Sequence, residues 1–121
     1  MYIVEYYERP NGQQPALEWL DNQDKKVAAN IEAKLQMLKS EGLRLLNTKV
    51  LKPIRGQSNL YEVIYSSFRL MTYFHEEQRV FWMLHGFRKQ RQRESAEINR
   101  GTELMEECKR FLEGGTNGQE V

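Results

Sequence analysis

The sequence predicts an α+β domain in which two N-terminal helices pack on a mostly antiparallel, twisted sheet that is followed by a C-terminal helix. Apolar residues recur at helical spacing within residues 24–40 and again within residues 94–112. Between these segments, β-branched and aromatic residues form short runs that are separated by turn residues. A length of 121 residues suits one ordinary domain, which we expect over residues 1–113, with a disordered glycine-rich tail over residues 114–121.

The N-terminal part is expected to form a strand, a short helix and a long helix. Residues 2–7 are aromatic and β-branched, which favours a strand. Pro15 suits the first turn of a helix, where its missing N–H costs nothing, so a short helix is expected over residues 15–20. The segment 24–40 has one apolar stripe and ends before Gly42, a natural helix stop. The stripe consists of Val27, Ile31, Leu35 and Leu38.

The second half is expected to form four strands and the last helix. The strands are predicted over residues 48–54, 60–65, 68–74 and 80–87, and their short connections favour an antiparallel meander. The helix over residues 94–112 contains Gly101, which weakens it by about 1 kcal/mol relative to alanine. Helices on one face of such a sheet would leave the other face free for function.

Charge is distributed unevenly along the chain, although the net charge is only +1. Residues 1–42 contain five Lys or Arg and seven Asp or Glu, residues 43–93 contain ten and three, and residues 94–121 contain three and seven. The middle segment therefore carries a local positive charge, which attracts polyanions such as nucleic acid.

Several classes of chemistry are not indicated by the residues present. The sequence has no glycine-rich phosphate loop followed by Lys and Ser or Thr, no His-Glu-x-x-His motif and no Gly-x-Ser-x-Gly motif. His75 and His85 have no cysteine near them, and a single cysteine, Cys108, provides neither a disulfide nor a cysteine-rich zinc site. We therefore expect no metal and no cofactor, and we expect Cys108 to pack in the core.

The cellular location is expected to be the cytoplasm. No apolar segment approaches the roughly 18 residues that a membrane span needs, so no membrane association is expected. The N-terminal residues lack the basic start and the cleavage site of a secretory signal.

Arg69 is the most informative single residue, because it lies inside an otherwise apolar strand. Period-two alternation places it on the same face as Met71 and Tyr73, where a charge must be paired, solvated or directed into a cleft. Its guanidinium could bind a phosphate through two hydrogen bonds, or it could form a salt bridge with Glu62 across the sheet. The sequence leaves both possibilities open.

Other basic residues flank the strands. The run Arg88-Lys89-Gln90-Arg91-Gln92-Arg93 follows a strong strand, so it would present positive charge at a sheet edge near Arg69, although such runs are also common on solvated surfaces. Three further cations at three-residue spacing are Lys49, Lys52 and Arg55.

Three segments together resemble the phage-derived, HigB-like branch of the RelE toxin superfamily. They are Leu60-Tyr61-Glu62-Val63, Phe68-Arg69-Leu70 and Met83-Leu84-His85-Gly86-Phe87-Arg88-Lys89. The resemblance is good over residues 60–89, and the predicted order of elements also matches the fold of that superfamily. The chain departs from the pattern at Ile64, where the family often has Arg, and after Lys89, where it lacks the family's proline.

The resemblance implies the toxin of a type II toxin–antitoxin system, a metal-independent endoribonuclease that cuts translated mRNA at the ribosome. Its expected partners are mRNA, the ribosome and a cognate helix-turn-helix antitoxin. Attack of a ribose 2′-OH on the adjacent phosphate needs a base, cations and an acid. Residues expected to serve this chemistry are Arg69, Arg88, Lys89 and His85. Further contacts to RNA are expected from Lys49, Lys52, Arg55, Arg91, Arg93 and Tyr73.

Two alternatives remain at this point. One is a protein of the same fold that has lost catalysis and only binds RNA, the ribosome or the antitoxin. The other is the ParE-like branch, which shares the fold but inhibits DNA gyrase. The Leu84-His85-Gly86-Phe87 motif favours the HigB-like branch, while the identity of the general base stays open among the lysines and His85.

Overall fold

The computed structural model describes residues 1–90, 92 and 94–118. Apart from a 3-10 helix at residues 42–45, the order of elements is the one expected from the sequence. In chain order the elements are β1 (Ile3–Tyr6), α1 (Pro15–Asp21), α2 (Lys25–Glu41), the 3-10 helix η1 (Gly42–Leu45), β2 (Leu51–Pro53), β3 (Leu60–Tyr65), β4 (Phe68–His75), β5 (Val80–Arg88) and α3 (Glu94–Gly118). Within the described residues, none of the helices has the length and apolar character needed to cross a membrane.

The five strands form one sheet in the order β1-β5-β4-β3-β2. Strands β2 to β5 pair as an antiparallel meander, and β1 adds to β5 in parallel, with Ile3 opposite Val80. The β4–β5 ladder contains an irregularity, because Met71 pairs with His85 whereas Thr72 pairs with Met83. Leu84 is therefore an extra residue in β5, which locally interrupts the alternation of its side chains.

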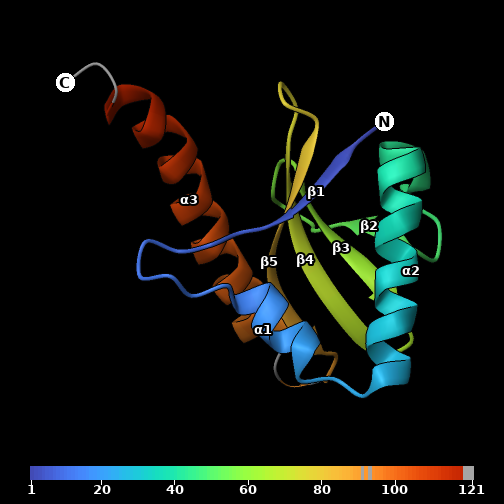
Figure 1. The fold of residues 1–121 in the computed structure, drawn as a ribbon. Coiled ribbons are helices and arrows are strands. Elements are labelled where there is room, and N and C mark those ends of the chain that lie inside the picture. Colours follow the sequence, from blue (N-terminus) through green and yellow to red (C-terminus); the bar gives the residue numbers. More distant parts are fainter. Residues whose placement is uncertain (91, 93, 119–121) are drawn as a thin grey trace.

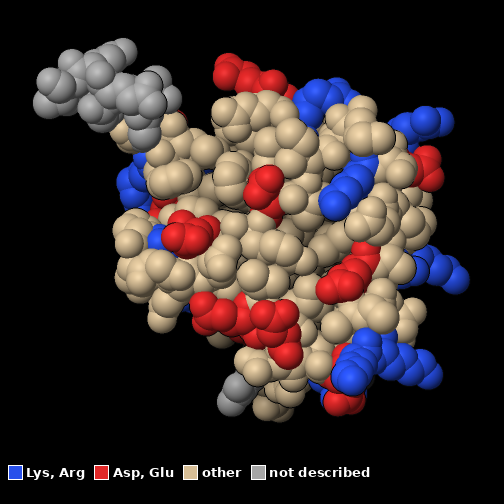
Figure 2. Space-filling view, in the orientation of Figure 1, with Lys and Arg blue, Asp and Glu red and all other residues tan. Residues whose placement is uncertain are grey.

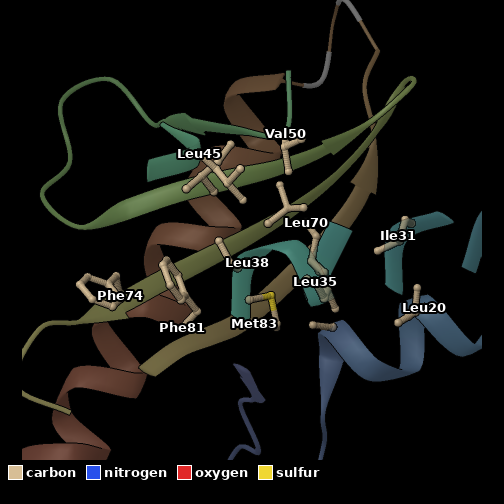
Figure 3. Close-up of a cluster of buried hydrophobic side chains, with 13 residues drawn as sticks. Leu20, Ile31, Leu35, Leu38, Leu45, Val50, Leu70, Phe74, Phe81 and Met83 are labelled. Atoms are coloured by element: carbon tan, nitrogen blue, oxygen red, sulfur yellow. The ribbon is translucent and has the colours of Figure 1, made fainter. Parts of the chain in front are cut away.

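One hydrophobic core lies between the sheet and the helices α1 and α2. Leu35 and Leu38 of α2 and Leu20 of α1 meet sheet residues such as Leu70 and Phe81 (Figure 3). The apolar stripe predicted for residues 24–40 is this buried face, with Ile31, Leu35 and Leu38 inside it.

A second core lies under α3, on the opposite face of the sheet. Leu104, Met105 and Cys108 of α3 pack with Met71 of β4 and Leu84 of β5. Figure 1 shows α2 and α3 on either side of the sheet. The expectation that the helices share one face is therefore wrong. The central strands are apolar on both faces, so both faces need a cover.

Two boundaries differ from the sequence-based expectation. Helix α3 extends to Gly118, past residue 112 where its end was expected, because extending a helix costs little once it has formed. Strand β2 is limited to Leu51–Pro53, since Asn47 has a positive φ of 64° that turns the preceding segment, and Pro53 lacks an N–H for the ladder.

The end of α2 agrees with the prediction. Gly42 has a φ of 54°, and a Cβ atom built there would lie 2.0 Å from the ring of Tyr2. A glycine is therefore required both by the backbone conformation and by the close packing of the N-terminal segment.

Candidate functional site

Arg69 lies on the face of the sheet that α3 partly covers. In the ladders it is opposite Ile64 of β3 and Phe87 of β5, and it shares its face with Met71, which contacts Gly101 of α3. The face predicted from alternation is thus confirmed. The α3 helix begins at Glu94, near this end of the strands, so the helix start and the β3–β4 hairpin border the same region.

The Arg69 guanidinium is held mainly by backbone oxygens. Its Nη1 donates to the carbonyl oxygens of Ser66, at 2.7 Å, and Phe68, at 3.0 Å. Its Nε lies 3.7 Å from Oε1 of Glu62, which makes an ion pair but exceeds hydrogen-bond distance. The side chain is only 12% exposed, and within the described residues its Nε is buried without a hydrogen-bond acceptor. An unsatisfied buried donor costs free energy, so this atom favours an added acceptor.

Glu62 shares this half-buried environment. Its side chain is 16% exposed, and burial raises the pKa of its carboxyl above the ordinary value, with Glu94 adding to the rise. Arg69, Lys89 and Lys52 act in the opposite direction. We name this group the Glu62–Arg69 site, which comprises Lys52, Glu62, Arg69, Lys89 and Glu94.

Two lysines form the rim of the Glu62–Arg69 site. Lys52 is exposed on β2, directly opposite Glu62 in the β2–β3 ladder. Lys89 follows β5, its backbone N–H donates to the carbonyl of Ser67 at 2.7 Å, and its Nζ lies 4.0 Å from Oε1 of Glu94. Both lysine side chains have access to solvent, so they can meet a ligand that approaches Arg69.

His85 lies on the same face but has its own partner. Its ring stacks on Phe87 with 5.7 Å between centroids, and its Nε2 lies 3.2 Å from Oε1 of Glu97 in α3. Desolvation lowers the pKa of this histidine below its ordinary value, while the hydrogen bond with Glu97 partly offsets the shift. Neutral imidazole is therefore the favoured form near pH 7.

Arg88 does not join Arg69. Its guanidinium lies 5.3 Å from the centroid of the Phe68 ring, and its Nε donates to Oγ of Ser67 at 3.2 Å. Phe68 packs with Trp19 of α1, so Arg88 is on the side of α1 and α2. Adjacent residues in a strand point to opposite faces, and Phe87 already faces α3.

The remaining predicted RNA contacts are spread over the molecule. Tyr73 lies farther along β4, where Lys109 of α3 stands 5.5 Å from its ring centroid. Lys49 and Arg55 are exposed in the segments before and after β2. Arg91 and Arg93 lie outside the described residues.

The sequence reasoning did not assign Glu62 and Glu94 of the candidate site, nor Glu97 beside His85. Glu62 was considered only as a salt-bridge partner of Arg69. The sequence does contain a sign of this role. Glu62 lies two residues after Leu60 in β3, so it is a carboxylate on a face that is otherwise apolar. Glu94 and Glu97 could not be assigned from the sequence, because their positions depend on where α3 packs on the sheet.

The charge on other parts of the surface differs from one element to the next. An open hollow lies beside the C-terminal part of α3, away from Arg69, and its walls include Glu76, Glu77 and Glu113. The view over α1 and α2 shows acidic side chains gathered around α1 and basic ones mainly along α2 (Figure 2). Within the described residues, no group of three or more His, Cys, Asp or Glu could hold a metal ion.

Comparisons with known proteins agree on one family and one fold. The model of the family described as "Phage derived protein Gp49-like" matches residues 18–106. No curated protein sequence matches the chain. A mutant of the Escherichia coli toxin RelE in the free state is similar in structure, with a TM-score of 0.62, 17% identity, and coverage of 84% of this chain and 95% of that one.

Two toxin–antitoxin complexes are also similar in structure. The intact E. coli RelBE complex gives a TM-score of 0.58 at 20% identity, covering 75% of this chain and 100% of that one. RelBE2 from Mycobacterium tuberculosis gives 0.56 at 19% identity, covering 73% and 98%. The strand order and helix placement described above are therefore those of the RelE fold.

Proposed function

Because the chain belongs to the phage-derived Gp49-like family and has the fold of RelE/HigB-like toxins, we propose that it is a toxin that cleaves translated mRNA at the ribosome. The resemblance of residues 60–89 to HigB-like toxins supports the same assignment. Cleavage would proceed by attack of a ribose 2′-OH on the adjacent phosphate, which needs no metal ion.

One observation carries this proposal. Arg69 is nearly buried, it is fixed by two backbone carbonyls, and its Nε lacks a hydrogen-bond acceptor within the described residues. A phosphate bound at Arg69 would supply the acceptor that this donor lacks, and charge-assisted hydrogen bonds from arginine to phosphate are among the strong ones.

The neighbouring lysines support a role in RNA binding. Lys52 and Lys89 flank the same position from β2 and from the end of β5, so a phosphate on Arg69 would meet positive charge on two further sides. In the transition state the crowded phosphate gains negative charge, which fixed cations stabilise. Lys89 would protonate the leaving 5′-oxygen.

A protein antitoxin is the proposed partner. The similar complexes from E. coli, M. tuberculosis and Pyrococcus horikoshii hold a RelE-type toxin together with an antitoxin. We propose a cognate antitoxin with a helix-turn-helix domain for this chain, encoded beside it.

The decisive experiment is induced expression followed by mapping of mRNA ends. We expect wild-type protein to stop growth and to produce mRNA cut within translated regions. Arg69→Lys keeps a positive charge beside Glu62 but removes the forked donor, and we expect it to lower cleavage by about 100-fold. Arg44→Lys, at an exposed position in η1, is the matched control and should cleave like wild type.

The other classes give different results in the same experiment. Growth arrest with intact mRNA and DNA damage would indicate a gyrase inhibitor. Absence of arrest, with folded protein confirmed by circular dichroism, would indicate a non-catalytic binding protein of this fold.

A further inference from the structure

We propose that Glu62 is the general base of this site, and that the substrate phosphate frees it by replacing the carboxylate as the partner of the Arg69 guanidinium. This inference rests on the proposed RNA cleavage and adds the residue that takes the proton from the attacking 2′-OH.

The Glu62–Arg69 contact is suited to exchange. The 3.7 Å between Nε and Oε1 makes an ion pair without a hydrogen bond, so a phosphate oxygen that reaches the guanidinium displaces no hydrogen bond to the carboxylate. Nη1 stays bonded to the carbonyls of Ser66 and Phe68, which would keep the guanidinium in place during the exchange.

The charges around Glu62 set its basicity. Burial raises the pKa of the carboxyl, Glu94 at the start of α3 raises it further, and Arg69, Lys89 and Lys52 lower it. When a phosphate neutralises Arg69 and the lysines, the opposing influence weakens, so Glu62 becomes a stronger base exactly when substrate is bound. Efficient general bases have a pKa closer to the working pH than a free carboxylate has.

Other nearby groups are less suited to this role. His85 has its Nε2 in contact with Glu97. Glu94 is 45% exposed and pairs with Lys89. Glu62 is the carboxylate that directly contacts the guanidinium expected to hold the phosphate.

Glu62 and Lys89 supply the base and the acid that the reaction needs. Glu62 accepts the proton of the 2′-OH while the 2′-oxygen forms a bond to phosphorus. The bond between phosphorus and the 5′-oxygen breaks, and that oxygen takes a proton from the Lys89 ammonium. The products are a 2′,3′-cyclic phosphate and a 5′-OH, and the protons then return through water.

The test uses the full-length protein and an mRNA oligonucleotide bound to programmed ribosomes. Single-turnover rates of wild type, Glu62→Gln, Glu62→Asp and the exposed control Glu5→Gln are measured between about pH 5.5 and 8.5. We expect Glu62→Gln to lower the rate about 100-fold and to abolish the rise of rate with pH seen in wild type. Glu62→Asp should recover part of the rate, and Glu5→Gln should match wild type.

A second measurement separates binding from chemistry. An mRNA with a 2′-deoxy nucleotide at the cut position should remain uncut, and Glu62→Gln should bind it as tightly as wild type does. A Glu62→Gln rate within about threefold of wild type would overturn the assignment, as would a reduced rate that keeps the wild-type pH profile, which indicates only positioning of Arg69. Absence of cleavage by wild type would overturn the proposed function and this inference together.

Discussion

His85 of β5 and Glu97 of α3 are in direct contact, with 3.2 Å between Nε2 and Oε1. This contact joins the strand beside Arg69 to the first turns of the helix that borders the Glu62–Arg69 site. The position of α3 over this end of the sheet therefore depends in part on a histidine whose charge changes near physiological pH.

Replacement of His85 should reveal a pH-dependent contribution to stability. Its pKa is lowered in the folded protein, so on acidification the unfolded chain binds a proton before the folded chain does. The stability that wild type has relative to His85→Gln should be present above the ordinary pKa of 6.5 and should decrease as the pH falls below it. Urea unfolding at about pH 7.5 and 5 measures this difference.

His75→Gln is the control for that measurement. His75 ends β4 and accepts a hydrogen bond from the backbone of Gln78 in the following turn. Titration of Glu62 is common to wild type and both variants, so it cancels in the comparison. An equal pH dependence for the two histidine variants would contradict burial of His85 as the cause of the pH-dependent stability.

Close packing at Gly86 gives a second prediction. A Cβ atom at Gly86 would lie 2.1 Å from the indole of Trp19, a rigid side chain of α1 that packs on the sheet. We expect Gly86→Ala to lower the free energy of unfolding by about 1–3 kcal/mol, because the helix must shift. Gly114→Ala, where no atom lies within 4 Å of the added carbon, should be neutral or slightly stabilising.

At Gly101 the expected loss of stability on replacement by alanine lies between those at Gly86 and Gly114. An added Cβ would lie 2.2 Å from Cε of Met71, the far end of a flexible side chain that can move. Gly101→Ala should therefore cost less than Gly86→Ala, since the alanine also favours the helix. Thermal unfolding of the three variants gives the order, and a Gly86→Ala variant as stable as wild type would show that the Trp19 contact adapts.

The sequence predicted local structure better than packing. Hydrophobic pattern and turn residues located the α-helices and strands in order but not the 3-10 helix η1, and alternation placed Arg69 on the correct face. It did not show that α3 covers the face opposite α1 and α2, because the side on which a terminal helix packs depends on contacts distant in the sequence.

The arrangement of the candidate site also depends on contacts between residues that are distant in the sequence. Leu84 is an extra residue in β5, so Leu84 and His85, although adjacent, both face α3. The alternation of side chains after this point is therefore shifted by one residue. The strand pattern alone does not reveal this shift. Arg88 was expected near Arg69 because its basic run follows a strand at a sheet edge and because of the family resemblance, and neither determines the face of its side chain. Glu62 was visible as a charged residue in an apolar strand, but its role depended on seeing Lys52, Lys89 and Glu94 around it.

A hydrogen-bonded ion pair anchors α3 at its middle and gives a third prediction. Nε and Nη2 of Arg9 donate to the two carboxylate oxygens of Glu107 at 3.0 and 3.2 Å, and the Tyr7 hydroxyl donates to Oε1 at 2.9 Å. These donors lower the pKa of Glu107. Glu107→Gln should thus destabilise the protein near pH 7.

The pH dependence tests the physical cause. A lowered carboxyl pKa stabilises the folded state above the ordinary value of 4.5, and that stability is lost as the pH falls through the folded pKa. The difference between wild type and Glu107→Gln should therefore shrink as the pH drops below 4.5. Glu103→Gln, at a position 70% exposed, is the control and should leave stability nearly unchanged at both ends of the range.

The two rim lysines should contribute to RNA affinity through charge. Lys52 and Lys89 are accessible beside Arg69, and each phosphate contact to a single strand adds about 0.7 to the slope of log affinity against log salt. Removing both should lower that slope by about 1.4 and weaken binding most at low salt. Lys25 and Lys26, exposed at the start of α2, form the matched control pair.

Fluorescence anisotropy with a 2′-O-methyl RNA, which cannot be cut, measures this binding across a salt series. The double variant Lys52→Ala/Lys89→Ala should bind more weakly than wild type at low salt and approach it at high salt, whereas Lys25→Ala/Lys26→Ala should follow the wild-type curve. An equal loss in both double variants would mean that RNA is attracted by overall charge rather than by the Glu62–Arg69 site. An unchanged slope in the first variant would exclude phosphate contacts by these lysines, because counterion release depends only on the charges that the RNA meets.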